Sequence, residues 1–546
     1  MASRALSFFL FLAGVYRLCA SLAPNPPDAS FQPSTWEDIP ASTDKISWWR
    51  CPQEHATYSR TRCMRLEVAL DYEDTQAGTT TIAFMKHLAA HKSADGLEVI
   101  YNPGGPGAGI DITLRGIDRL RKELGTSNDI IVFDPRGVGR SGPKVDCVDG
   151  DELLHYQLAS AIYPHTLKAA LAKGALWGES CEKNLDVSAR YISTPAVARD
   201  MLTYVERQAA TQGLDSAEAK VNFYGKSYGT VIGATFATLY PDFVGRFALN
   251  GVVQGKSWYD NWDRSPDEDE VFFQFFRQCS EAGRKSCKFW AGSAEDTKAR
   301  FDRLLEGLNA NPLQIHYSAV ELDVPPHITA DFVLRHVIGA SYQGHDSFWE
   351  LAWQLAELER GNYRPLLQQR AVPLLSCSMC TLKDWWELTY TFVDPTFNDA
   401  NPAVKCIDHA PLKIDSMQDF EDLLTMHQNS TRYFSDYARY ILAQCLKWPY
   451  RPPPSQQFDG NYGANLDQPM LILTSTFDPV TPAVYAREMA SQFPGSILVQ
   501  NSVVGHCASG TCIDGVLNSY FEHGELPEPG TICKPDHRPS LHGRFA

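Results

Sequence analysis

One short segment constrains the fold of this chain more than any other. Residues 221–241 read VNFYGKSYGTVIGATFATLYP, in which a strand-like apolar half is followed by a helix-like half of small residues. Gly225 and Gly229 remove side chains where a sharp strand-to-helix turn would otherwise produce a clash. Such a turn holds the Ser227 hydroxyl clear of the backbone at a helix N-terminus, where partial positive charge favours a developing anion. We therefore predict that Ser227 is a catalytic nucleophile rather than an ordinary turn serine; Ser341, in GASYQG, has the wrong spacing and lies in a helical stretch.

A serine nucleophile needs two partners, and the sequence supplies a candidate for each. Near neutral pH the hydroxyl requires a general base, and that base requires an orienting carboxylate. After such a turn the partners follow in the order acid, then histidine, each at the C-terminal end of a strand. Asp478 follows the predicted strand 470–474, and His506 follows the predicted strand 496–500. The predicted catalytic residues are therefore Ser227, Asp478 and His506.

A glycine-rich loop after an earlier predicted strand is the candidate oxyanion hole. In NPGGPG, at residues 102–107, the glycines allow backbone amides to turn toward a substrate. We predict that Gly105, with Gly104 beside it, and Tyr228, the residue after the nucleophile, supply the donors. The loop does not fit a dinucleotide-binding fingerprint, because Ile110 stands where the third glycine is required. The predicted chemistry requires neither a metal nor an organic cofactor.

The order of the predicted elements indicates an α/β fold that carries an insertion. Residues 64–72 and 79–89 alternate apolar and polar residues, which predicts an antiparallel pair of strands. Short apolar strands then alternate with helical stretches, as in a mostly parallel sheet covered on both faces. A long stretch with aromatic and charged residues at helical spacing follows, and strands then return. The predicted parts are a first core segment, a large, mainly helical cap and a C-terminal core segment, at residues 24–253, 254–455 and 456–546.

The N-terminus and the charge predict export and exclude some partners. Residues 1–23 combine an early arginine, an apolar run and small residues, which predicts a cleaved signal peptide, with an anchoring helix as the alternative. The formal charge of -16 argues against nucleic acid or an anionic membrane surface as a partner. The mature protein is expected to be soluble and secreted, with a vacuole as the alternative destination. The sequence does not indicate whether the protein is a monomer or an oligomer.

Cysteine usage agrees with export. The chain has 14 cysteines, and the loss of Cys19 with the signal peptide leaves an odd number, so at least one thiol is expected to be free or intermolecular. Cys51 with Cys63 and Cys279 with Cys287 are plausible short-range pairs, although the pattern leaves the connectivity open.

Two short motifs bear on metal binding and glycosylation. The segment CSMC at residues 377–380 could be half of a zinc site, but no second C-x2-C pair follows at the required spacing. Residues 429–431 form a glycosylation sequon, which would be usable in a eukaryotic secretory pathway.

Five motifs in a fixed order resemble those of a known family. NPGGPG, DPRGVGRSG, GKSYGT, FDPVTP and GH together resemble the secreted tripeptidyl aminopeptidase and proline iminopeptidase branch of the α/β-hydrolases. AVKCID, CLKWP and YFEHGELPEPGTICKP resemble its C-terminal region, so that the likeness extends over about residues 51–533. The resemblance implies the α/β-hydrolase fold, an exopeptidase acting on free peptide N-termini, and the triad roles of Ser227, Asp478 and His506. It also implies disulfides between Cys406 and Cys445 and between Cys512 and Cys533.

The chain departs from the family pattern at two positions. Asn250 stands where family members usually have aspartate, which bears on the expected substrate range. Cys507 follows the histidine where glycine is common, and is expected either to crowd the site or to form a bridge. Neither departure removes a member of the triad.

The predicted function is that of a serine hydrolase acting on a peptide or small-molecule substrate, most simply a secreted aminopeptidase. An esterase or lactonase acting on a small natural product is the alternative, because the fold does not determine the substrate. A catalytically inactive binding protein is disfavoured by the complete triad. An aminopeptidase also needs a carboxylate for the substrate ammonium group. The acidic residues 267–270 are candidates, but their capping-box spacing favours the start of a helix.

Overall fold

The computed structural model describes most of the chain. Residues 1–23 and 377–380, which carry the predicted signal peptide and the CSMC segment, lie outside the described residues. Among the residues that are described, no helix combines the length and apolar character needed to cross a bilayer. The described residues are 32–55, 60–91, 93, 95–151, 167–261, 268–315, 327–367, 399–411, 414, 416–431, 433 and 443–536.

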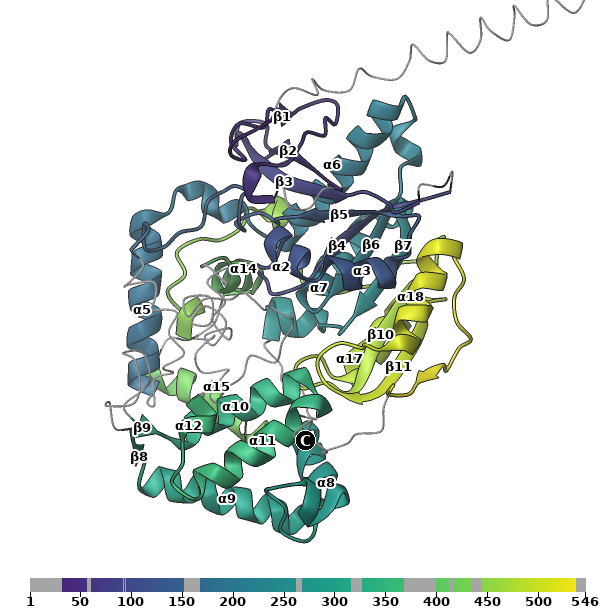
Figure 1. Ribbon diagram of the computed structural model, residues 1–546. Coiled ribbons are helices and arrows are strands. Elements are labelled where there is room, and N and C mark those ends of the chain that lie inside the picture. The colour runs from purple at the N-terminus through teal and green to yellow at the C-terminus, as the bar shows by residue number, and fades with distance from the viewer. Residues whose placement is uncertain are drawn as a thin grey trace, which may run out of the picture.

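A ten-stranded sheet in the order β1-β2-β3-β5-β4-β6-β7-β10-β11-β12 forms the centre of the fold (Figure 1). The predicted antiparallel pair is confirmed: β3 pairs antiparallel with both β2 and β5, while the other neighbours run parallel. The strands are β1 (Ala41–Ser42), β2 (Thr61–Ala69), β3 (Thr79–His87), β4 (Glu98–Asn102), β5 (Asp129–Phe133), β6 (Val221–Lys226), β7 (Val244–Asn250), β10 (Leu471–Phe477), β11 (Ile497–Val504) and β12 (Ile532–Cys533).

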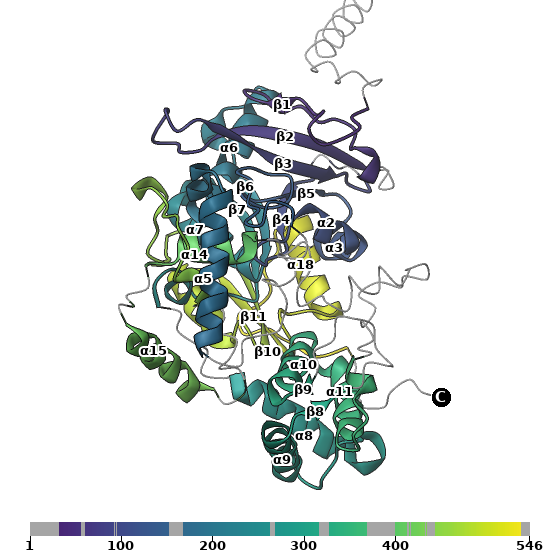
Figure 2. The same cartoon turned by 90° about the vertical axis from the view of Figure 1, so that its left-hand side faces the viewer.

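Helices cover both faces of this sheet, as expected for strands that are apolar along their whole length. One hydrophobic cluster joins the sheet to α2 (Ile110–Arg115), α3 (Ile117–Leu124) and α18 (Thr511–His523). A second cluster joins it to α6 (Thr194–Gln212), α7 (Tyr228–Leu239) and α17 (Ala483–Gln492). Figure 2 shows the two helical layers on either side of the strands. The predicted fold class, an α/β-hydrolase fold with a mostly parallel sheet, is confirmed.

The chain between β7 and β10 is mainly helical and has a hydrophobic core of its own. Phenylalanines from several helices pack there, for example Phe272, Phe301 and Phe348. We call α8–α11 the cap helices; Figure 1 shows them grouped near β10 and β11. The helices of this stretch are α8 (Glu268–Ser286), α9 (Ala294–Ala310), α10 (Ala330–Gln343), α11 (His345–Leu358), α12 (Arg364–Leu367), α14 (Ala400–Asp408) and α15 (Met417–Ser430), with a small hairpin of β8 (Leu313–Gln314) and β9 (His327–Ile328).

The helix α14 belongs to the core of the sheet and not to the core of the cap helices. Its side chains Ala403, Val404 and Ile407 are buried in the same cluster as α6 and α7. The stretch inserted between the strands therefore returns to the sheet before β10 begins.

Five disulfides occur in the described part of the chain. The two short-range pairs and the two pairs implied by the family resemblance are all present, and a fifth joins Cys147 to Cys181. This fifth bridge fixes α5 (Leu167–Asn184) to the loop after β5 and was not predicted. Among the described cysteines only Cys507 is free.

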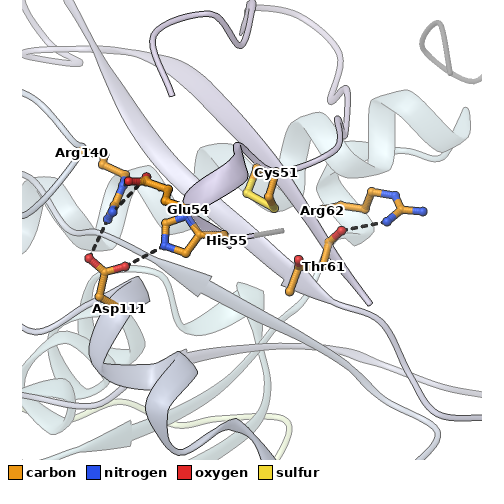
Figure 3. The surroundings of a disulfide bond; sticks show 8 residues. Cys51, Glu54, His55, Thr61, Arg62, Asp111 and Arg140 are labelled. Carbon is orange, nitrogen blue, oxygen red and sulfur yellow. Dashed lines mark hydrogen bonds and ion pairs between the residues drawn. A yellow bond between two sulfur atoms is a disulfide. The ribbon is translucent and has the colours of Figure 1, made fainter. Parts of the chain in front are cut away.

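A polar cluster beside the first disulfide ties the N-terminal segment to α2 (Figure 3). The Nε2 atom of His55 lies 2.8 Å from Asp111 Oδ1, and Arg140 donates to Asp111 Oδ2 at 3.0 Å. Burial alone would raise the pKa of Asp111, but the interactions with His55 and Arg140 lower it to about 2. Because α2 follows the glycine-rich loop directly, this ionised carboxylate fixes the downstream end of that loop.

Candidate active site

The turn at Ser227 has the sharp geometry that the sequence predicts. Ser227 lies between β6 and α7 with φ 53° and ψ -121°, at a positive φ that non-glycine residues rarely adopt. A Cβ atom at Gly225 would lie 2.4 Å from the Gly229 carbonyl oxygen, and one at Gly229 would lie 2.7 Å from the Asn102 carbonyl oxygen. The two glycines are therefore required by close backbone contacts. The Ser227 hydroxyl has no hydrogen-bond partner among the described residues, so it is available to a substrate.

His506 and Asp478 form a buried pair at the ends of β11 and β10. The His506 Nδ1 atom lies 3.0 Å from Asp478 Oδ1 and 3.1 Å from Oδ2. Four further donors surround the carboxylate: the amides of Val480, Thr481 and Cys507 and the Thr481 hydroxyl, at 2.8–2.9 Å. Burial opposes ionisation, but His506 and these donors keep the pKa of Asp478 below its ordinary value. Asp478 is therefore an anion that fixes the orientation of the imidazole.

The other nitrogen of His506 is unoccupied. Nε2 is buried and has no hydrogen-bond partner among the described residues. Burial disfavours the imidazolium, but the charge of Asp478 outweighs this effect and raises the pKa of His506 well above its ordinary value. The side chain is thus prepared to accept and hold a proton at Nε2.

Ser227 and His506 both contact the backbone of residues 250–251, at the end of β7. The Ser227 amide donates to the Asn250 carbonyl oxygen at 2.9 Å, and a Cβ atom on Gly251 would lie 3.4 Å from His506 Cε1. No hydrogen bond joins the Ser227 hydroxyl to His506 Nε2 in the described part of the chain. Catalytic hydrogen bonds are often long without substrate and shorten when it binds. The three predicted catalytic side chains are therefore gathered around the ends of neighbouring strands.

The glycine-rich loop lies directly on this turn. Gly104 has φ 107°, and a Cβ atom there would lie 2.9 Å from Ser227 Cβ and 3.4 Å from the Tyr228 amide nitrogen. However, the Gly104 amide donates to Asn102 Oδ1 at 2.9 Å. Gly104 therefore provides the close approach but uses its own amide, so that Gly105 and Tyr228 remain the candidate donors to an oxyanion. The Tyr228 amide has no acceptor within α7, because Tyr228 is its first residue.

Two contacts that local sequence patterns did not reveal hold the glycine-rich loop and Tyr228 in place. The Asn401 side chain, on α14, donates to the carbonyl oxygen of Pro106 at 2.7 Å. The Tyr228 hydroxyl lies 2.8 Å from Thr194 Oγ1, and Thr194 in turn donates to the buried carboxylate of Asp408. Burial raises the pKa of Asp408 to about 6. The Tyr228 side chain is thus buried and fixed at its hydroxyl group.

Asn250 has a structural role. Its side chain is fully buried, donates to the Ala508 carbonyl oxygen at 2.9 Å and accepts from the Ala508 amide at 2.7 Å. An aspartate could make the second of these bonds but not the first. Asn250 therefore holds the loop that carries His506, and its burial gives no support to the expectation that it affects the substrate range.

Cys507 neither forms a disulfide nor removes a catalytic group. It has φ 65°, and its Sγ atom lies 3.5 Å from the Asn250 carbonyl oxygen. A Cβ atom on the facing Gly251 would lie 2.5 Å from that sulfur. The thiol therefore packs closely against the backbone of Asn250 and Gly251, which lies next to His506.

Replacement of Cys507 by glycine is expected to raise the free energy of unfolding by about 0.5–1 kcal/mol. A left-handed conformation costs a residue with a Cβ roughly 1–2 kcal/mol, and the greater freedom of glycine in the unfolded chain offsets part of the gain. Urea unfolding measures the difference. Cys507→Ala is the matched control, because it removes the thiol but keeps the Cβ. Greater stability of the alanine variant than of the glycine variant would refute the account of strain.

The acidic run that might bind a substrate amine is engaged elsewhere where the structure describes it. Asp269 accepts a hydrogen bond from the Thr431 hydroxyl at 2.8 Å, and Glu270 accepts one from Gln274 at 2.7 Å. Residue 267 lies outside the described ranges. Among the described residues there is also no group of three or more side chains suited to hold a metal ion.

Comparison with known proteins agrees with this architecture. A family model for the alpha/beta hydrolase fold matches residues 99–277, and a model described as TAP-like protein matches residues 431–533. A tripeptidyl aminopeptidase from Streptomyces lividans is 25% identical over 90% of this chain and 87% of its own length. Serine protease Hip1 from Mycobacterium tuberculosis is 24% identical over 86% of this chain and 87% of its own. An esterase from Exiguobacterium antarcticum, at 12% identity, matches 83% of this chain and 98% of its own with a TM-score of 0.33.

The fold, the strand order and the matched models define the chain as an α/β-hydrolase. Within this fold, the TAP-like match and the two relatives show that the chain is similar to tripeptidyl aminopeptidase-like proteins, as its motifs also indicate.

Proposed function

We propose that the protein is a secreted serine exopeptidase that releases short peptides or residues from free N-termini. The observation that carries the proposal is the buried pair of His506 and Asp478, with an unoccupied Nε2, beside the unbonded hydroxyl of the Ser227 turn. The names of the relatives, a tripeptidyl aminopeptidase and a serine protease, support a peptide as the substrate.

The proposed reaction proceeds through an acyl-enzyme. His506 Nε2 takes the proton of the Ser227 hydroxyl as its oxygen attacks the scissile carbonyl carbon, and Asp478 stabilises the resulting imidazolium. The Gly105 and Tyr228 amides bind the oxyanion. His506 then gives the proton to the leaving nitrogen, and the peptide bond breaks. Water attacks the acyl-enzyme with His506 again as the base, which restores Ser227.

Secretion forms part of the proposal. Five disulfides in the described ranges support an oxidising compartment, because such bonds are rare in the cytosol. We propose that residues 1–23 are removed during export and that residues 254–455 are the insertion that covers the site. The sequon at residues 429–431 falls at the end of α15.

Hydrolysis of matched substrates tests the proposed function. Purified mature protein is given tripeptide anilides with free and with acetylated N-termini, beside simple aryl esters. Cleavage of only the free-amine peptides is the expected result, because an exopeptidase of this kind must recognise the ammonium group. Turnover of esters without turnover of peptides would overturn the peptidase and would favour a small-molecule hydrolase with the same triad.

The pH dependence of this hydrolysis follows from the charge on His506. Protonated His506 cannot accept the Ser227 proton, so activity requires the neutral form. Because Asp478 raises the pKa of His506, we expect kcat/KM to increase with pH with an apparent pKa above 6.5, the ordinary histidine value. Initial rates between pH 5 and pH 9, in steps of about half a unit, measure it. In Asp478→Asn, the residual activity should have a lower apparent pKa; an unchanged midpoint would contradict the coupling of the two groups.

A further inference from the structure

The aromatic side chain of Tyr342, at the end of cap helix α10, covers one side of His506. The two ring centroids are 4.5 Å apart, with 49° between the ring planes. His506 itself is almost completely buried, with 3% of its side chain exposed, whereas 41% of Tyr342 is exposed. A large ring therefore lies next to the catalytic base and is still accessible to a bound molecule.

The position of Tyr342 is fixed by the backbone. The His506 amide donates to the Tyr342 carbonyl oxygen at 2.9 Å. At Gly344, which follows α10, a Cβ atom would lie 2.2 Å from the Val504 carbonyl oxygen. The end of α10 is thus packed against the end of β11, so the ring is held by two regular elements.

The surroundings of the imidazole engage only one of its two ring nitrogens. The Nδ1 edge faces Asp478 and the Thr481 hydroxyl, the latter at 3.2 Å, and Cε1 faces Gly251. Of the two ring nitrogens, only Nε2 is without a partner among the described residues. The leaving nitrogen of a peptide must come within about 3 Å of Nε2 to receive its proton. The residue attached to that nitrogen therefore lies beside the imidazole against which the Tyr342 ring packs at 4.5 Å.

We propose that Tyr342 determines specificity for the residue on the C-terminal side of the scissile bond, by contact with an apolar or aromatic side chain there. This inference rests on the proposed exopeptidase activity and adds to it the chemistry of the leaving group. The acyl part of the substrate is held elsewhere, since its carbonyl oxygen is directed at the Gly105 and Tyr228 amides.

Capture of the acyl-enzyme by added amines isolates this subsite. A tripeptide p-nitroanilide forms the acyl-enzyme, and phenylalanine amide or glycine amide then competes with water. The amine nitrogen attacks the acyl carbon, the C–N bond forms, the ester bond to Ser227 breaks, and the amine proton passes through His506 to Ser227. The ratio of tetrapeptide amide to free tripeptide therefore reports binding of the acceptor side chain, independently of how the acyl-enzyme was formed.

We expect phenylalanine amide to capture the wild-type acyl-enzyme about threefold to tenfold more efficiently than glycine amide, as an aromatic contact predicts. Tyr342→Ala should bring this preference between the two amines close to one, whereas Tyr342→Phe should keep it. Trp353→Ala is the control for an exposed cap aromatic, because Trp353 has no ring contact with His506 among the described residues.

Two results would overturn the inference and separate it from the proposed function. If the wild type and Tyr342→Ala both release nitroaniline but show the same preference between the amines, Tyr342 does not contact the leaving residue. If the wild type does not cleave the anilide at all, the proposed peptidase fails and this inference fails with it.

Discussion

The Ser227→Ala variant is expected to lose about 10⁶-fold in kcat toward a free-amine tripeptide anilide, with its fold unchanged. The variant removes the atom that forms the acyl-enzyme, and water has no equivalent position against the carbonyl. The structural cost is small, because the hydroxyl makes no hydrogen bond within the described residues. Alanine also keeps the same backbone strain at φ 53°. Steady-state rates and thermal unfolding of the same preparations measure the two effects.

Ser341 provides the matched control for this variant. It lies in the other serine-containing segment, GASYQG, and its buried hydroxyl has no hydrogen-bond partner in the part of the chain that the structure describes. Ser341→Ala should therefore keep the activity and lose little stability, because the removed hydroxyl leaves no partner unsatisfied. A Ser227→Ala variant within tenfold of the wild type would contradict the assignment of the nucleophile.

Asp478→Asn is expected to lower kcat by about 10⁴-fold. The carboxylate accepts from His506 Nδ1 at 3.0 Å, which places the proton on Nδ1 and leaves Nε2 free to act as a base. An asparagine presents an amide donor to Nδ1, favours the wrong tautomer and removes the charge that stabilises the imidazolium. Rates with the same anilide measure the loss.

Thr481→Val gives a graded comparison for this effect. Thr481 donates its hydroxyl to Asp478 Oδ2 at 2.8 Å, and valine keeps the side-chain volume while removing that bond. Since the backbone donors to Asp478 remain, the loss should be about tenfold, the effect of roughly 1.4 kcal/mol. Equal losses in the two variants would show that the loop has been disrupted rather than the charge removed.

The sequence could predict those parts of the site that depend on short segments. The turn at Ser227 follows from Gly225 and Gly229, whose roles are local close contacts. The positions of Asp478 and His506 follow from apolar strands, because the C-terminal ends of parallel strands meet at one edge of a sheet. The four predicted disulfides came from short spacing or from the family resemblance.

The features that the sequence did not reveal depend on contacts between distant segments. Tyr342 reaches His506 from the cap helices, and Asn401 reaches the glycine-rich loop from α14. Nothing in the periodicity of α10 or α14 distinguishes these residues from their neighbours. The hydrogen bond from the Gly104 amide to the Asn102 side chain likewise depends on the geometry of the loop, which the sequence NPGGPG does not specify.

Covalent labelling with a fluorophosphonate, followed by mapping of the modified peptide by mass spectrometry, identifies the nucleophile itself. We expect a single adduct on Ser227, formed rapidly by the wild type, slowly by Asp478→Asn and not at all by Ser227→Ala. An unlabelled wild-type protein, or an adduct on a different residue, would contradict the claim that Ser227 is the nucleophile activated by His506 and Asp478.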